Sequence, residues 1–177
     1  MSTSREHPVL IRLIHADECD ELARITVAAY RQLNGGEPLG PYEAELLDVE
    51  RRRLDSEVYV ALDDDAVLVG GVTYVPGPER AMAEFSDPGG CGIRMLAIDP
   101  AHQGKGAGRT LVETCVARAR QQRRERIILH SAPTMLVAQA MYLRMGFRAA
   151  PELDEFIHEG PYAEGDALHL RAFVLDC

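Results

Sequence analysis

Six consecutive residues near the middle of the chain have the composition of an anion-binding turn. They follow an apolar run at 93–98 and a turn signal at Asp99 and Pro100, and they precede an amphipathic stretch at 109–122. This order predicts a strand, a glycine-rich turn and a helix, whose first backbone amides have no intrahelical acceptors. Glycines also let a phosphate approach the main chain closely. The residues of the turn are Gln103, Gly104, Lys105, Gly106, Ala107 and Gly108.

Two common nucleotide-binding motifs do not fit this turn. Its spacing differs from Gly-x-Gly-x-x-Gly, and no Gly-Lys-Ser/Thr follows four variable residues. A nucleotide-binding domain that uses the turn for ATP is therefore the least favoured of the interpretations considered below.

The hydrophobic patterning predicts one α/β domain over residues 1–177 with a mixed sheet. The segment 134–145 is apolar on most sides, so we expect that helix to be largely buried. The segment 76–90 is a long loop rich in proline and glycine, a kind of loop that often has a functional role. Strands are expected at 9–15, 57–62, 66–75, 93–98, 126–131, from 147 and at 167–175, and helices at 17–33, 42–54, 105–122 and 134–145, in the order β-α-α-β-β-β-α-β-α-β-β.

Charge and composition narrow the possible partners. The net charge of −9 argues against nucleic acid. The charge is uneven, because residues 105–126 carry a net +5 and the rest of the chain −14. A polyanion could bind at the start of this basic segment, while the remaining surface favours cations.

The remaining sequence signals predict an intracellular protein without a metal site. The polar N-terminus lacks the apolar core of a signal peptide, and no apolar run is long enough to span a membrane. The four cysteines form no C-x-x-C pair, so we expect reduced thiols and a cytoplasmic location. Neither the histidines nor the run at 63–65 has metal-ligand spacing.

Two linked motifs resemble the GNAT superfamily of acyl-CoA N-acyltransferases. The first is Gln103-x-x-Gly106-x-Gly108, and the second is Ala138-x-x-x-Tyr142-x-x-x-Gly146-Phe147. The resemblance is strong over 93–147 and looser over the whole order of elements. It implies a mostly antiparallel sheet of about seven strands flanked by four helices, with acetyl-CoA as acyl donor.

The resemblance also implies roles for individual residues. The backbone amides from Gly104 to Arg109 would bind the diphosphate of coenzyme A, and Gln103 would shape the turn. The strand residues Leu96, Ala97 and Ile98 would pair with the pantetheine arm as an added strand does. An amide near Leu96 would polarise the thioester carbonyl. Tyr142 would be the general acid that protonates the departing thiolate; the other interpretation is a core aromatic residue.

The sequence departs from the family pattern at two places. Met135 stands where an Asn often contacts the pantetheine arm, so Ser131 is our candidate for that contact. The stretch 90–93 lacks the Glu that many members use as base through water. Glu84 is the best candidate base, His130 is an alternative, and no base is needed if the amine loses its proton before it binds.

The acceptor is expected on the side opposite the coenzyme, lined by the segments 30–42 and 156–166. Their polar and aromatic residues suit a small amine or a peptide N-terminus. We therefore predict an N-acetyltransferase, with homodimer formation as an option; the alternative is an acyl-CoA-binding domain without turnover. The residues concerned are Tyr30, Arg31, Asn34, Glu37, Tyr42, His158, Glu159 and Tyr162.

Overall fold

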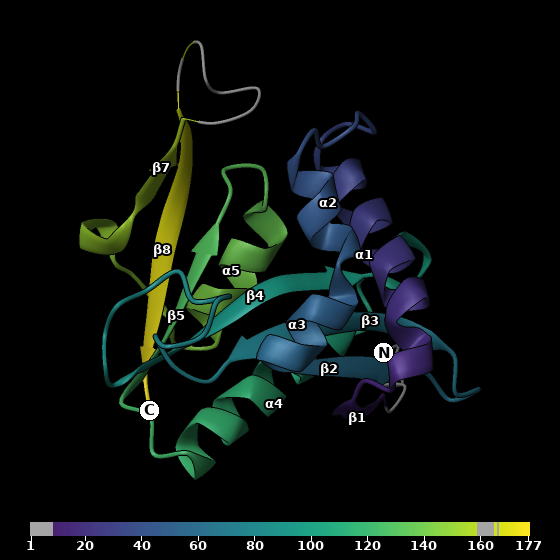
Figure 1. Ribbon diagram of the computed structural model, residues 1–177, viewed down its shortest axis with the longest axis horizontal. Coiled ribbons are helices and arrows are strands. Elements are labelled where there is room, and N and C mark those ends of the chain that lie inside the picture. The colour runs from purple at the N-terminus through teal and green to yellow at the C-terminus, as the bar shows by residue number, and fades with distance from the viewer. Residues whose placement is uncertain (1–8, 159–164, 166) are drawn as a thin grey trace, which may run out of the picture.

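A single twisted sheet forms the centre of the computed structural model, which describes residues 9–158, 165 and 167–177 (Figure 1). The strand order is β1-β2-β3-β4-β5-β8-β6, and β7 pairs with β8 beside this path. All neighbours are antiparallel except β4 and β5. The strands are β1 (Leu10–Leu13), β2 (Glu57–Leu62), β3 (Leu68–Val75), β4 (Gly90–Ile98), β5 (Arg126–Ser131), β6 (Arg148–Ala149), β7 (Glu155–Ile157) and β8 (Leu168–Asp176).

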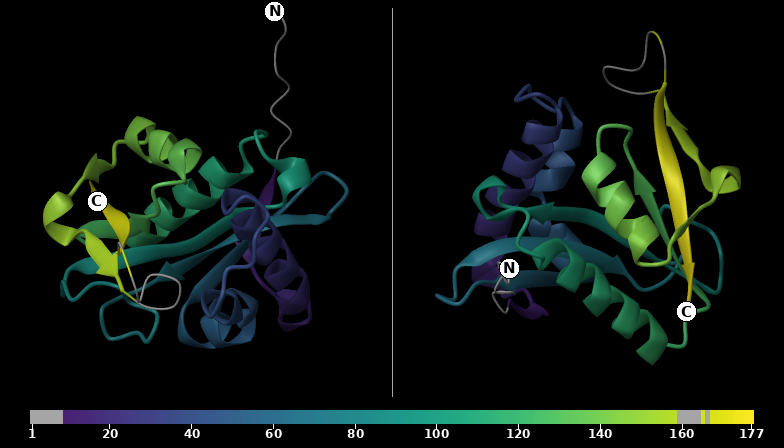
Figure 2. Two further views of the ribbon diagram at one scale, coloured as in Figure 1. Left: turned by 90° about the horizontal axis from the view of Figure 1, so that it is seen from above. Right: turned by 180° about the vertical axis from the view of Figure 1, so that it is seen from behind.

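Helices cover both faces of the sheet. Figure 2 shows α4 and α5 on one face and α1, α2 and α3 on the other. Among the described residues, no helix combines the length and apolar character needed to cross a bilayer. The α-helices are α1 (Cys19–Leu33), α2 (Tyr42–Leu47), α3 (Val49–Asp55), α4 (Ala107–Gln121) and α5 (Leu136–Arg144), with short 3₁₀ turns at Ala16–Glu18, Pro100–His102 and Pro151–Leu153.

The mixed, mostly antiparallel sheet is confirmed, but the elements are more numerous than predicted. The described residues form eight strands and five α-helices rather than about seven and four. The helix expected at 42–54 is divided at Asp48, whose backbone leaves the helical region and whose side chain accepts a hydrogen bond from the Arg51 amide. An aspartate in this position caps a new helix. Strand β7 has only three residues, too few for a periodic signal.

The expectation that the helix at 134–145 is largely buried is wrong. Only Gln139 and Tyr142 of α5 are buried, whereas Leu136 and Val137 are 68% and 85% exposed. Only one side of the helix packs against the core, so apolar residues on its other sides remain in solvent. The helix ends just before Gly146, whose φ of +95° lies in the left-handed region that favours glycine.

The strands β4 and β5 separate part of the way along their length. Their parallel pairing ends at Ile93 and Leu129, after which β4 continues along β3 and β5 continues along β8 (Figure 1). We call this point of separation the split. Helix α4 packs across the sheet next to it through the fully buried residues Leu111, Val112 and Cys115.

The buried stripe of α4 should hold both the core and the glycine turn in place. We expect Leu111→Ala to lower the free energy of unfolding by about 2–5 kcal/mol, because Leu111 is fully buried and its truncation leaves a cavity in the core. The matched Leu47→Ala change, at a residue 51% exposed, should alter it by no more than about 0.5 kcal/mol. Urea unfolding measures both, and equal losses would contradict this account of the core.

Candidate functional site

The glycine-rich turn presents bare backbone amides at the start of α4. Gly104 and Gly106 have φ values of +78° and +90°, and a Cβ built on either would meet no atom within 4 Å. Among the described residues, the amides of Gly106, Ala107 and Gly108 have no hydrogen-bond acceptor, and no side chain caps the helix. Unpaired donors at the positive end of a helix dipole are the features that an anion site requires.

Gln103 fixes the turn to two other elements. Its side-chain Nε2 donates to the Ile98 carbonyl at 3.2 Å, which ties the turn to the end of β4. The same nitrogen donates to Oε1 of Gln32 on α1 at 3.0 Å. Lys105 is exposed on the turn, and Arg109 donates to Glu113 at 2.8 Å one helical turn later. The turn therefore has a defined position relative to the strand before it.

A hollow on the β2–β3 side of the turn does not suit a diphosphate. Its volume is about 230 Å³, and its lining includes the three acidic residues 63–65 together with His102 and Lys105. The carboxylates would repel a diphosphate. Among the described residues, no group of three or more acidic, histidine or cysteine side chains could hold a metal ion.

The strand before the turn has a free edge on the side of the split. Residues 94–98 pair with β3, but on their other side no described strand pairs with them. Gly71 lies opposite Ala97 and Thr73 opposite Arg94, so Met95 and Leu96 together oppose Val72. This irregularity, with a φ of +52° at Met95, is a β-bulge. The main-chain groups of Leu96, Ala97 and Ile98 can therefore pair with an extended ligand.

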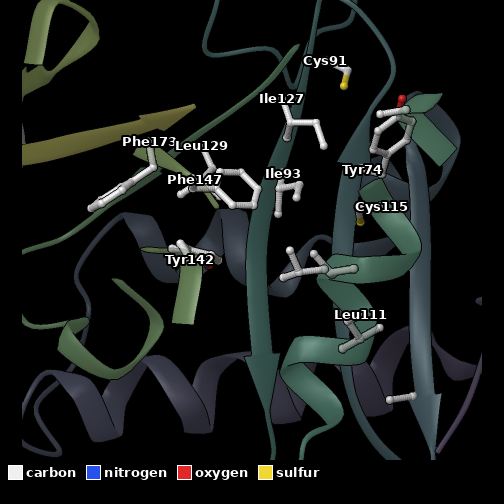
Figure 3. Close-up of a cluster of buried hydrophobic side chains, with 14 of the residues drawn as sticks. Tyr74, Cys91, Ile93, Leu111, Cys115, Ile127, Leu129, Tyr142, Phe147 and Phe173 are labelled. Atoms are coloured by element: carbon white, nitrogen blue, oxygen red, sulfur yellow. The ribbon is translucent and has the colours of Figure 1, made fainter. Parts of the chain in front are cut away.

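Tyr142 lies on the α4 side of the split, within the aromatic part of the core (Figure 3). It is 5% exposed, and its ring lies 5.6 Å from the ring of Phe147 and 6.1 Å from that of Phe173. Burial raises the pKa of Tyr142, so the phenol keeps its proton at neutral pH. Its placement fits both the core residue and the proton donor that the sequence suggests.

Ser131 is less available to a ligand than we expected. It is 2% exposed, and its hydroxyl accepts a hydrogen bond from Nε2 of Gln139 at 3.2 Å. Gln139 also donates to the Ala132 carbonyl at 2.8 Å. The serine therefore helps to hold the start of α5 against the end of β5. Gln139 was not predicted from the sequence, although a polar residue within an apolar helical stretch is a usable signal.

Glu84 bridges the two strands on the opposite side of the split. Arg94 and His130 are the first residues beyond the last β4–β5 pair, one on each strand. Glu84 Oε1 lies 2.5 Å from Nη2 of Arg94, and its Oε2 lies 3.7 Å from Nδ1 of His130. The structure thus brings the two candidate bases together. Arg94 was missed, although an arginine inside an apolar strand is an unusual residue that deserved notice.

His130 favours its charged form in this position. Its Nε2 lies 2.9 Å from the Leu153 carbonyl, which can only accept, so this nitrogen carries a proton. Its Nδ1 faces the Glu84 carboxylate and also needs a proton to bond with it. Burial alone would lower the pKa of His130, but the bonds to Glu84 and Leu153 outweigh burial and raise it.

The expected acceptor side is only partly assembled in the described residues. Tyr30 and Tyr42 lie together, with ring centroids 6.1 Å apart. Burial raises the pKa of Tyr30, and the nearby phenols of Tyr42 and Tyr142 raise it further. Asn34 donates hydrogen bonds within its own loop, and Arg31 forms an ion pair with Glu43. The side chains of Glu37 and His158 are exposed. Glu159 and Tyr162 lie outside the described residues.

The arrangement can bind an elongated anion and bring its far end to the split. The bare amides of the turn suit a diphosphate, and the free edge of β4 leads from the turn to the split. A phenol lies on one side of that point, and a bridged carboxylate lies on the other. Such a site can carry out group transfer between two ligands that approach from opposite faces of the sheet.

Comparison with known proteins gives a family and a fold. A model of the acetyltransferase (GNAT) family matches residues 20–147. A search of curated proteins finds no match.

Solved structures share the fold at low sequence identity. A GNAT-family acetyltransferase of Staphylococcus aureus Mu50 has a TM-score of 0.71 at 15% identity, covering 96% of this chain and 99% of that one. The putative acetyltransferase yncA of Salmonella typhimurium, solved with its cofactor acetyl-CoA, has a TM-score of 0.68 at 19% identity, covering 96% of this chain and 94% of that one. A ribosomal-protein-alanine N-acetyltransferase of Brucella melitensis has a TM-score of 0.68 at 21% identity, covering 95% of this chain and 99% of that one.

The bridge between Glu84 and His130 predicts a linked titration. In the wild type, we expect the pKa of His130 to lie above the ordinary histidine value. Glu84→Gln should lower this pKa, because the carboxylate that favours the charged imidazole is lost while the burial that disfavours it remains. The raised pKa also implies stability that is present below pH 6.5 and is lost as the pH rises through the folded-state value.

NMR titration of the imidazole signals measures this pKa. The control is Glu79→Gln, which removes an exposed carboxylate paired with Arg80 on the same loop and should leave the titration unchanged. A pKa of His130 that does not respond to Glu84→Gln would contradict the bridge.

Proposed function

The chain belongs to the GNAT family of acetyltransferases, which transfer the acetyl group of acetyl-CoA, and from this premise we propose that its acceptor is a primary amine of a small molecule or peptide. The observation that carries the proposal is that the free edge of β4 leads to the glycine-rich turn, where the backbone amides at 106–108 have no hydrogen-bond acceptor among the described residues. Location in the cytoplasm, a single domain and homodimer formation stay predictions.

We propose that main-chain groups bind the coenzyme. The amides from Gly104 to Arg109 would hold the diphosphate, with Lys105 adding a positive charge beside it. The edge formed by Leu96, Ala97 and Ile98 would pair with the pantetheine arm, and Gln103 keeps the turn and this edge in register. When bound, acetyl-CoA supplies the thioester, and the Leu96 amide would donate to its carbonyl oxygen.

Tyr142 is proposed as the proton donor. The amine nitrogen forms a bond to the acetyl carbon while the carbon–sulfur bond breaks and leaves its electron pair on sulfur. The phenol of Tyr142 then gives sulfur its proton. The proton lost by the amine, to Glu84 or to water, balances the transfer. A pKa raised by burial keeps the phenol protonated before the reaction.

Glu84 is a better candidate base than His130 in this arrangement. Both ring nitrogens of His130 face acceptors, so the imidazolium has no lone pair for a proton. Glu84 carries a negative charge at the split, where it can attract an ammonium group. Its carboxylate is already in contact with the Arg94 guanidinium at 2.5 Å. We therefore propose that Glu84 contributes mainly by binding the acceptor near the thioester.

The glycine turn can be tested through coenzyme affinity. We expect Gly106→Ala to weaken binding of coenzyme A about tenfold, since a φ of +90° costs an L-residue roughly 1–2 kcal/mol. Binding of acetyl-pantetheine, which lacks the diphosphate, should not change.

Gly36→Ala is the matched control, because Gly36 has a φ of +88° in open space on another loop. It should leave coenzyme affinity unchanged in isothermal titration calorimetry. Equal losses for coenzyme A and acetyl-pantetheine would place the diphosphate elsewhere.

Tyr142→Phe separates an enzyme from a binding domain. With a competent amine, we expect kcat to fall about a hundredfold, the range of a lost general acid, with coenzyme affinity unchanged. The ring and its packing remain, so the fold should be retained.

The control is Tyr74→Phe, which removes a phenol hydroxyl that donates to Oε1 of Gln122 at 2.7 Å, at the C-terminal end of α4. It should leave kcat unchanged when thiol release is followed. An unaltered kcat in Tyr142→Phe would reduce Tyr142 to a core residue, and coenzyme binding without transfer to any amine would favour the binding domain.

A further inference from the structure

A guanidinium without a countercharge is buried beside the acceptor side of the split. Arg52 is 1% exposed. Its Nη1 donates to Oγ1 of Thr73 and its Nη2 to the Leu46 carbonyl, both at 3.1 Å, while its Nε has no partner. None of the described carboxylates forms an ion pair with it. A buried cation usually has a paired anion, so this excess charge calls for one nearby.

Arg94 brings a second cation to the same place. Thr73, which accepts the bond from Arg52, lies directly opposite Arg94 in the β3–β4 register, so both side chains lie on one face of the sheet. The Arg94 side chain is 14% exposed. Burial lowers the pKa of Arg52, and the charge of Arg94 lowers it further, as expected for neighbouring cations.

The local carboxylates do not balance these cations. Glu84 is shared between Arg94 and His130, which is itself held in a form that favours a positive charge. Glu45 lies 4.0 Å from Arg94 and is 57% exposed, so solvent screens it. The exposed Asp48 acts on Arg52 and the half-buried Glu155 acts on His130 through their charges, but neither forms an ion pair with these cations. The acceptor side of the split therefore has one directly paired anion, Glu84, beside two buried or half-buried arginines and His130.

An acceptor with only an ammonium group would be repelled by these cations. A carboxylate next to the amine would face the cations while the ammonium faces Glu84, so both ends of the molecule would be compensated. Arg94 already donates from Nη1 to the Met82 carbonyl at 3.2 Å and contacts Glu84 through Nη2. A guanidinium has five N–H donors in one plane, so the remaining donors can bind the oxygens of a carboxylate. Arg52 cannot touch the ligand and would contribute through its charge.

Building on the proposed N-acetyl transfer, we propose that the acceptor is an α-amino acid, whose carboxylate is recognised by Arg94 beside the buried charge of Arg52 and whose amine lies at Glu84. Arg94 is thus a specificity-determining residue of this chain. The overall acidic surface does not oppose such a ligand, because an α-amino acid is a zwitterion without net charge.

The test compares α-amino acids with their own carboxamides. Each pair has the same side chain and amine position, and rates are expressed per concentration of free base because the amide lowers the amine pKa. We expect kcat/KM of the wild type to be about tenfold or more higher for the acids, mainly because their KM is lower. This factor corresponds to the loss of one charge-assisted hydrogen bond in the carboxamides.

Two variants locate the preference. Arg94→Gln should bring the acids to within about threefold of the carboxamides, while Arg94→Lys, which keeps the charge but loses the planar fork, should retain part of the preference. Arg53→Gln is the control, because Arg53 pairs with Glu50 on the exposed side of α3. It should leave the preference intact.

The possible outcomes separate this inference from the proposed function. Carboxamides accepted as well as acids by the wild type, or a preference that persists in Arg94→Gln, would overturn the inference and leave N-acetyl transfer standing. Acetyl-CoA binding without acetylation of amino acids, carboxamides or peptides would overturn the proposed function itself. The comparison of acids with carboxamides in the wild type does not depend on the folding of any variant.

Discussion

The separation of β4 from β5 after Ile93 and Leu129 is the constraint on which the site depends. Continued pairing would have satisfied the edge of β4 and left no main-chain groups for a ligand. The bulge at Met95 and Leu96 marks the region where β4 leaves β5, and it changes which face the following residues occupy. At the same separation, Arg94 and His130 follow the last β4–β5 pair, one on each strand.

The two faces of the sheet at the split have different chemistry. On the α4 side, the turn, the free edge and Tyr142 form a neutral to positive surface suited to an elongated anion. On the other side, Arg94 and His130 emerge from the two separating strands, and Glu84 links them from the loop before β4. Two ligands can therefore meet at the split without competing for the same groups.

This division suits direct attack by an amine better than a covalent enzyme intermediate. The thiol of Cys91 is a poor nucleophile, because burial raises its pKa to about 11.

The parts of the site that could be predicted are those set by local chain chemistry. Gly104 and Gly106 are required by positive φ values in a turn, and this requirement is visible in the sequence. The apolar stripe of α4 likewise follows from its spacing. Arg52, Arg94 and Gln139 were not predicted, because their roles depend on strand register and on contacts between distant segments. The partner of Arg52 is a threonine 21 residues away, and that threonine lies opposite Arg94 only because of the bulge. The exposed sides of α5 have the same origin, since its composition does not say how many of its sides meet the core.

Net charge and local charge act over different distances, which explains why the acidic composition did not reveal the arginines. The surface carries most of the negative charge and affects the approach of ligands through a field that salt screens within about 10 Å. Inside the split, low polarity strengthens each interaction, so a few fixed groups dominate recognition. Arg52 is the clearest case, because this guanidinium is 1% accessible and forms no ion pair with any of the described carboxylates. A chain with a net charge of −9 can thus contain a locally positive site, provided that its cations are buried and most of its anions are exposed.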